Sequence, residues 1–238
     1  MRIVVFQHVP AEHPGVFRDF LAARGVAWDV VELDAGEPIP DLARYDALWV
    51  MGGPMDVWEE DEFPWLVAEK AAIREAVVER RMPFLGVCLG HQLLADALGG
   101  EVGTAKTPEV GIMDVTRSTA GRVSPFLAAM PATMTCLQWH GAEVQRTPPG
   151  ATTLMSSPAC AVQAFSVGER ALGVQFHLEV TADTVPDWVA IPAYHESLVA
   201  SIGEQGLAEF QRAAADTLPL LTAHARRLFD NWMRVAGG

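Results

Sequence analysis

Short apolar runs alternate with segments of helical periodicity through the first hundred residues. The runs predict buried β-strands, and the segments between them repeat apolar residues every three or four positions, as amphipathic helices do. The predicted strands cover residues 2–7, 26–33, 45–51 and 83–87, and the predicted helices cover residues 15–24, 63–81 and 92–99. This alternation predicts a parallel, doubly wound sheet with right-handed crossovers.

The second half of the chain changes to short strand-like runs separated by Gly and Pro. These runs cover residues 110–117, 133–139, 151–156, 161–166 and 171–176, and helical periodicity returns in residues 192–201 and 207–235. We therefore expect an α/β, flavodoxin-like three-layer fold whose mostly parallel sheet carries a small antiparallel addition. No repeat, low-complexity tract or linker divides the chain, so residues 1–238 are expected to form a single domain that ends in helices at about 192–235.

Composition narrows the classes of function. Half of the 238 residues are hydrophobic, which is enough for a core, yet no apolar run is long enough for a membrane span or a signal peptide. Three cysteines without paired spacing indicate a reducing, cytoplasmic location. A net charge of −13 weighs against nucleic acid or an anionic membrane as a partner.

The stretch Gly86-Val87-Cys88-Leu89-Gly90 joins a predicted strand to a predicted helix. It is a cysteine version of the nucleophile elbow, in which small residues allow a sharp, strained turn. A helix N-terminus favours the thiolate form of a cysteine placed there. The alternative is that Cys88 is a small buried hydrophobic residue, and the elbow alone supports both interpretations equally.

A pair of glycines follows the strand at 45–51. Bare backbone N–H groups at Gly52 and Gly53 can approach a ligand closely and stabilise an oxyanion, with the Leu89 N–H as the natural second donor. Taken alone, however, Gly52-Gly53-Pro54 is more simply a turn.

His177 and Glu179 stand two residues apart in an extended segment, so their side chains face the same side. A carboxylate bonded to one imidazole nitrogen leaves the other free to act as a base. Cys88, His177 and Glu179 can therefore form a nucleophilic triad, although a bare His-x-Glu is more often a surface pair. His8 and His13 show no recognised metal-ligand spacing, so no metal site is expected.

Three motifs in order resemble the class I (triad-type) glutamine amidotransferases, over residues of about 2–181. They are Gly52-Gly53-Pro54, residues 86–92 and residues 175–179. Residues 138–141 stand where that family carries a loop that helps to bind glutamine, and residues 157–165 resemble its stand-alone, GMP-synthetase-like members. The resemblance implies the family's fold and a cysteine-nucleophile C–N hydrolase, or glutaminase, without a cofactor.

The mechanism that the resemblance implies begins with attack of the Cys88 thiolate on the side-chain amide of glutamine. Backbone N–H groups of Gly53 and Leu89 hold the oxyanion. His177, oriented by Glu179, protonates the leaving ammonia and then activates the water that hydrolyses the γ-glutamyl thioester to glutamate.

The resemblance also implies which residues bind the substrate. Gly52 and the Gln92 side chain would contact it, and the backbone around Trp139 and His140 would hold its amino-acid end. His91 has no catalytic counterpart in the family and is expected to be structural or to face solvent.

The chain departs from the family's pattern at two points. Leu178 replaces the proline of the usual His-Pro-Glu and lacks its fixed φ. Ala142 replaces the aspartate of the usual His-Gly-Asp, so that any polar role there is lost or moves to Glu143.

Three alternatives remain open on the sequence. Residues 182–238 are too few for an acceptor-activating domain, so the chain would either supply ammonia to a separate synthase subunit or act alone as a γ-glutamyl peptide hydrolase. A non-catalytic binding protein with this fold is a second class, and a homo-oligomer is compatible with each. A related chaperone- or protease-like cysteine hydrolase would carry histidine directly after the elbow cysteine, where Leu89 stands.

Overall fold

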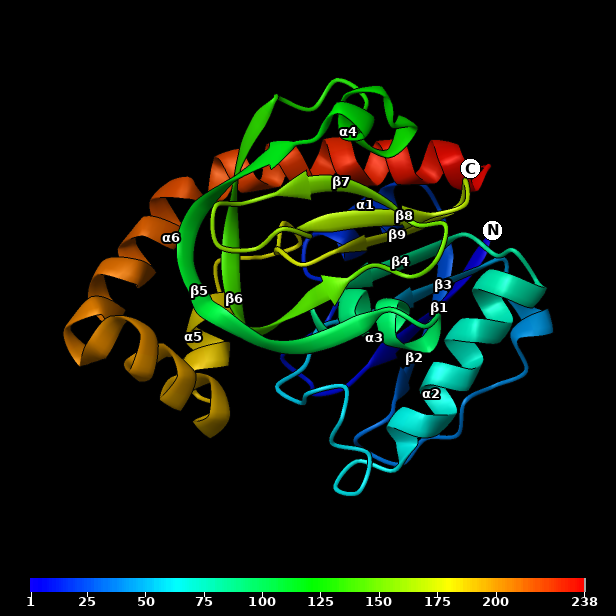
Figure 1. Cartoon of the computed structure of the whole chain (residues 1–238), viewed down its shortest axis with the longest axis horizontal. Helices are drawn as coiled ribbons and strands as arrows, with labels where there is room; N and C mark the ends of the chain where they lie inside the picture. Colours follow the sequence, from blue (N-terminus) through cyan, green and yellow to red (C-terminus); the bar gives the residue numbers. More distant parts are fainter. Residues whose placement is uncertain (238) are drawn as a thin grey trace.

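A nine-stranded sheet in the order β2-β1-β3-β4-β9-β8-β7-β5-β6 runs through the protein (Figure 1). The computed structural model describes residues 1–237. The strands are β1 (Arg2–Gln7), β2 (Ala27–Glu32), β3 (Ala47–Val50), β4 (Phe84–Val87), β5 (Glu101–Arg117), β6 (Thr133–Arg146), β7 (Thr152–Ser156), β8 (Ala164–Val167) and β9 (Ala171–Val174). The helices are α1 (Phe17–Ala23), α2 (Trp65–Arg74), α3 (Leu89–Ala97), α4 (Thr119–Val123), α5 (Thr184–Val189) and α6 (Pro192–Ala236), with short helical turns η1 (Leu42–Arg44), η2 (Glu75–Glu79) and η3 (Pro125–Leu127).

Five neighbouring strands, β2-β1-β3-β4-β9, are parallel and form the predicted doubly wound core. Their side chains point alternately to two apolar layers. On β1, for example, Ile3 and Val5 join one layer, whereas Val4 and Phe6 join the other. Because both faces are buried, these strands read as continuous apolar runs, which is why the sequence locates them well.

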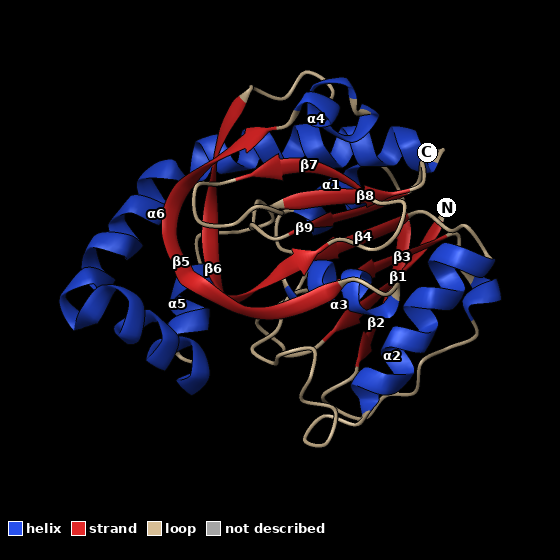
Figure 2. Cartoon of the chain, viewed as in Figure 1, coloured by secondary structure: helices blue, strands red, loops and turns tan. Residues whose placement is uncertain are grey.

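Helices cover the two faces of the parallel strands (Figure 2). Helices α2 and α3 pack on one face, and α1 and the C-terminal half of α6 pack on the other. On the α6 face, Phe229 and Trp232 meet Trp49 edge-on, with ring centroids 6.3 and 5.3 Å apart. The Trp232 indole also donates a hydrogen bond of 3.0 Å to the Phe84 carbonyl of β4. This α6 contact closes the three-layer fold that the sequence predicts.

The antiparallel addition comprises four strands, β8, β7, β5 and β6. Strands β5 and β6 are much longer than the predicted 110–117 and 133–139 and curve along one side of the molecule (Figure 1). Their register shifts between Thr104 and Glu109. Residues 101–109 are largely polar and include a proline, so their apolar pattern does not reveal a strand.

The predicted break between two C-terminal helices lies inside α6. Gly203 has φ 72° and ψ 162°, a conformation that interrupts the helix and that glycine adopts without strain. It separates an N-terminal arm, residues 192–202, from the part of α6 that packs on the sheet. None of the described helices, α6 included, is both long and apolar enough to cross a membrane.

We expect Trp232→Ala to lower the free energy of unfolding by roughly 3–5 kcal/mol, because it leaves a cavity where the indole packs. Trp232 is 1% exposed. Leu220→Ala, on the same helix but 45% exposed, should change it by less than about 0.5 kcal/mol. Urea unfolding of the two variants measures both values, and equal losses would contradict the role of α6 as the closing layer.

Candidate active site

Cys88 occupies the sharp turn between β4 and α3. Its φ of 51° and ψ of −105° are strained for a residue with a side chain, as in a nucleophile elbow. The flanking glycines are required by close backbone approach: a Cβ at Gly90 would lie 2.1 Å from the Val50 carbonyl oxygen. A Cβ at Gly86 would lie 2.4 Å from the carbonyl oxygen of Gly90. Cys88 therefore precedes the first turn of α3, near its positive end.

A cavity of about 230 Å³ opens over Cys88 at the carboxyl ends of the parallel strands. Five of the residues singled out from the sequence line it together: Gly53, Cys88, Gln92, Trp139 and His140. The others in the lining are Pro54, Met55, Asp56, Thr104, Gly141, Ala142, Ala193, Tyr194 and Ser197. The cavity is thus built from the ends of β3 and β4, the hairpin β5–β6 and the arm of α6.

His177 and Glu179 form a buried pair beside Cys88. His177 Nδ1 lies 2.6 Å from Glu179 Oε1. The Leu178 N–H donates to the second oxygen, Oε2, at 3.0 Å. A proline at this position would have no N–H to donate, so the departure from His-Pro-Glu gives the carboxylate a backbone hydrogen bond in place of a fixed φ.

The surroundings of His177 favour its protonated form. Burial by itself lowers the pKa of His177, but the neighbouring Glu179 carboxylate and, after it, Cys88 raise it well above its ordinary value. The His177 backbone is held in place by reciprocal hydrogen bonds to Leu137, of 2.9 and 3.2 Å. An imidazolium in this position can act as a general acid.

Gln175 is a contact of the thiol to which the sequence assigns no role. Its amide Nε2 donates to Cys88 Sγ at 3.5 Å. Gln92 Nε2 in turn donates to Gln175 Oε1 and to the Ala142 carbonyl oxygen, both at 3.1 Å. The available signal was position: Gln175 stands two residues before His177 in an extended segment, and so faces the same side.

Glu12 and Tyr194 are further site residues that the sequence does not reveal. The Tyr194 hydroxyl, on the arm of α6, donates to Glu12 Oε1 at 2.5 Å. Burial raises the pKa of Glu12 above its ordinary value. The Trp139 indole also donates to Ser197 of the arm, at 2.9 Å. Because these partners are far apart in sequence, no local pattern relates them, and together they hold the arm over the cavity.

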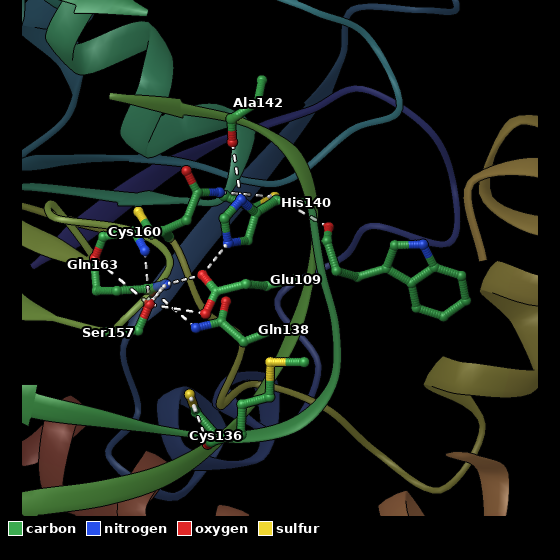
Figure 3. Close-up of polar contacts among 12 residues, drawn as sticks. Glu109, Cys136, Gln138, His140, Ala142, Ser157, Cys160 and Gln163 are labelled. Carbon is green, nitrogen blue, oxygen red and sulfur yellow. Dashed lines mark hydrogen bonds and ion pairs between the residues drawn. The ribbon is translucent and has the colours of Figure 1, made fainter. Parts of the chain in front are cut away.

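A network of buried polar groups lies behind His140 (Figure 3). Its Nδ1 lies 2.9 Å from the Ala142 carbonyl oxygen, and its Nε2 lies 3.1 Å from Glu109 Oε2. Ser157 and Gln163 also donate to Glu109, at 2.8 and 2.6 Å. Burial raises the pKa of Glu109, but the hydrogen bonds from His140, Ser157 and Gln163 outweigh burial and hold it below its ordinary value. The network fixes the part of β6 that lines the cavity.

Two groups of potential metal ligands occur among the described residues, each with donor atoms within 4.8 Å of one another. They are Glu109 with His140 and Cys160, and Glu12 with His177 and Glu179. In the first group both imidazole nitrogens of His140 already have protein partners, and in the second His177 Nδ1 already contacts Glu179. His8 and His13 do not converge on an ion: His8 contacts Gly52 and Glu69, and His13 Nδ1 accepts from the Gly15 N–H at 3.1 Å.

His91 is structural, and the expectation that it faces solvent is wrong. Its side chain is fully buried, with its ring centroid 4.9 Å from that of Phe165. Burial lowers the pKa of His91 to about 3, so it is neutral.

Comparison with known proteins agrees with this geometry. Residues 16–187 match the family model of class-I glutamine amidotransferases. The chain is 32% identical to the putative glutamine amidotransferase-like protein YfeJ of Salmonella typhimurium, over 78% of each chain. It is 33% identical to one subunit of the glutamine-hydrolysing GMP synthase of Saccharolobus solfataricus, over 64% of this chain and 77% of the relative.

A plant protein and a solved structure are also similar. Gamma-glutamyl peptidase 3 of Arabidopsis thaliana is 28% identical over 73% of this chain and 72% of its own. The crystal structure of a glutamine amidotransferase from Thermotoga maritima superposes with a TM-score of 0.87 at 29% identity, over 100% of this chain and 99% of the other. The predicted fold class is confirmed.

We expect iodoacetamide to alkylate Cys88 faster than the other two cysteines. Burial raises the pKa of Cys136 well above its ordinary value and that of Cys160 to about 12, so both are unreactive thiols. Peptide mass spectrometry over a time course measures the three rates, and Cys88→Ala should remove the fast reaction. If Cys88 reacts no faster than Cys136 and Cys160, the thiolate interpretation is wrong.

We expect Glu109→Gln to lower the free energy of unfolding by about 1–3 kcal/mol at pH 7, because it removes a charged hydrogen-bond acceptor. The folded-state pKa of Glu109 lies below its ordinary value of 4.5, so its stabilising effect is present above that pH and lost as the pH falls. The difference between wild type and variant should therefore narrow on going from pH 7 to below about pH 4 in urea unfolding. A difference that does not change with pH would contradict this assignment.

Proposed function

Because the chain belongs to the class-I glutamine amidotransferase family, we propose that it hydrolyses the side-chain amide of a γ-glutamyl compound, with glutamine as the first candidate. One observation carries the proposal. Cys88 stands in a strained turn at a helix start, beside His177, whose Nδ1 lies 2.6 Å from the Glu179 carboxylate. This is the arrangement of a nucleophile, its base and an orienting carboxylate.

In the first half of the reaction, the Cys88 thiolate attacks the amide carbon and a C–S bond forms. The carbonyl electron pair moves onto oxygen. The N–H groups of Gly53 and Leu89 would donate hydrogen bonds to the resulting oxyanion. The Leu89 N–H is available because it belongs to the first turn of α3 and has no partner four residues earlier in the helix. His177 gives its proton to the leaving nitrogen, and ammonia departs from a γ-glutamyl thioester.

In the second half, the neutral His177 takes a proton from water as the oxygen attacks the thioester carbon. The C–S bond breaks, which releases glutamate and restores the thiolate beside an imidazolium. Glu179 stabilises that imidazolium at both stages without accepting its proton. The raised pKa of His177 suits this cycle, since the resting enzyme then holds the proton that the leaving group needs.

The cavity supports a substrate of amino-acid size. Its volume of about 230 Å³ lies below the ~300–1,000 Å³ of pockets for drug-sized ligands. We assign Gln92 and the backbone of Gly52, Trp139 and His140 to substrate binding. The Ala142 carbonyl, which accepts from Gln92, would take part through the main chain, so the missing aspartate need not be replaced by Glu143.

Two uses of this hydrolysis remain to be separated. Similarity to the GMP synthase subunit of Saccharolobus solfataricus supports a glutaminase that passes ammonia to a separate synthase. Similarity to gamma-glutamyl peptidase 3 supports a hydrolase that acts alone on γ-glutamyl peptides.

We expect Cys88→Ala to abolish glutamate release while the protein stays folded. His177→Ala should act nearly as strongly, with losses of more than about 10⁴-fold in kcat for each, because members of a triad act as a unit. The loss of kcat in Glu179→Gln should be roughly tenfold smaller, because Glu179 orients His177 and does not itself transfer a proton. Cys136→Ala, which removes a buried thiol outside the cavity, is the matched control and should keep wild-type turnover.

The assay uses glutamine, γ-glutamyl dipeptides and γ-glutamyl amines, with ammonia and glutamate both measured. If only glutamine is hydrolysed, with equal amounts of ammonia and glutamate released, the result would favour the ammonia donor. Turnover of γ-glutamyl dipeptides would favour the peptidase. Full turnover by Cys88→Ala would overturn the mechanism for every substrate.

A further inference from the structure

The peptide between Gly52 and Gly53 is hydrogen-bonded through its carbonyl to the buried side chain of His8. We infer that His8 and Glu69 form a positioning pair that orients this peptide, so that the Gly53 N–H faces the cavity as an oxyanion donor. The inference rests on the function proposed above. It assigns a task to two residues that lie outside the triad and do not line the cavity.

The contacts of His8 define the pair. His8 follows β1 directly and is fully buried, as is Glu69 on α2. Its Nδ1 lies 2.7 Å from the Gly52 carbonyl oxygen, and its Nε2 lies 3.0 Å from Glu69 Oε1. Both partners are acceptors, so each ring nitrogen donates and the ring carries a positive charge.

Charge and packing around His8 agree with this form. Burial by itself lowers the pKa of His8, but the carboxylates of Glu69 and, further away, Glu12 raise it above its ordinary value. The indole of Trp65 stacks on the imidazole, with centroids 5.4 Å apart and planes 16° apart. The two hydrogen bonds set the orientation of the ring, in which Nδ1 points to the Gly52 carbonyl.

The geometry of a peptide carries this orientation to Gly53. In a planar trans peptide the carbonyl and the following N–H point in opposite directions. When the Gly52 carbonyl points to His8, the Gly53 N–H points away from His8. Gly53 lines the cavity together with Cys88, so the N–H is directed to the side where the oxyanion forms.

The Gly52–Gly53 peptide needs a hydrogen bond from another part of the chain because its own residues do not fix its conformation. A Cβ at Gly52 would lie 2.5 Å from Glu12 Oε2, and a Cβ at Gly53 would lie 2.9 Å from Leu89 Cδ2, so a side chain at either position would have to displace its neighbour. A peptide flanked by two glycines has many accessible backbone conformations. The hydrogen bond from His8 selects one of them.

The test compares His8→Asn and Glu69→Gln with wild type. Loss of one oxyanion donor costs ~10²–10³ in kcat, and loosening its peptide should cost less: about 10- to 100-fold for His8→Asn and about tenfold for Glu69→Gln. KM for the amide substrate should stay within about twofold, because the oxyanion exists only in the transition state. Glu69→Gln leaves a neutral imidazole, whose hydrogen bond to the Gly52 carbonyl is weaker than that of an imidazolium, so it carries the test if His8→Asn does not fold.

A γ-glutamyl aldehyde provides a readout that general destabilisation does not imitate. The thiolate adds to the aldehyde carbon, and the carbonyl oxygen becomes the alkoxide of a thiohemiacetal in the position of the oxyanion. The affinity of each variant for the aldehyde should fall by the same factor as its kcat. Trp65→Phe, which alters the packing on His8 but keeps both hydrogen bonds, is the control and should retain kcat and aldehyde affinity within about twofold.

The outcomes separate the two proposals. Wild-type turnover together with unchanged kcat and aldehyde affinity in both folded variants would overturn the inference alone. So would equal losses in Trp65→Phe, or a loss expressed in KM, since those indicate a purely structural role. A wild-type protein without turnover or aldehyde adduct would overturn the proposed function, and this inference with it.

Discussion

The close passage of the first turn of α3 over the ends of β3 and β4 is the constraint on which the rest of the structure depends. The backbone at Gly90 lies so near Val50 that only glycine fits there, and Gly86 meets the same helix from the other side. This contact forces Cys88 into a left-handed conformation and places it at the end of the helix where N–H groups are unpaired. Position and reactivity of the thiol thus have one steric origin.

Three buried imidazole–carboxylate pairs fix the backbone segments around that thiol. His8 with Glu69 holds the end of β3, His140 with Glu109 holds the bend of β6, and His177 with Glu179 follows β9. The segments of His8 and His177 lie beyond the ends of strands and lack the regular hydrogen-bond ladder, and the His140 pair lies beside a register shift in β5–β6. The buried polar groups at all three places must find partners. Such pairs add little net stability, but each leaves its backbone segment one arrangement in which the buried polar groups are hydrogen-bonded.

Much of this architecture is readable from sequence, and the missed parts share a physical cause. Strands buried on both faces and the elbow around Cys88 have local signatures, so the parallel core and the cavity could be placed. Glu12 and Tyr194 lack such signatures, because their importance lies in partners brought close only by the fold. Residues 101–109 are missed for another reason: they extend a strand whose partner, β6, supplies the order that their polar composition does not predict.

The arm of α6 has a consequence for the time course of synthesis. Cys88 leaves the ribosome 109 residues before Ser197, the last residue of the cavity lining. At ~5–20 residues per second that interval is about 5–20 s. During it the growing chain contains neither the finished cover of the cavity nor, for most of the time, His177. The arrangement around Cys88 therefore cannot assemble until the last part of the chain has emerged.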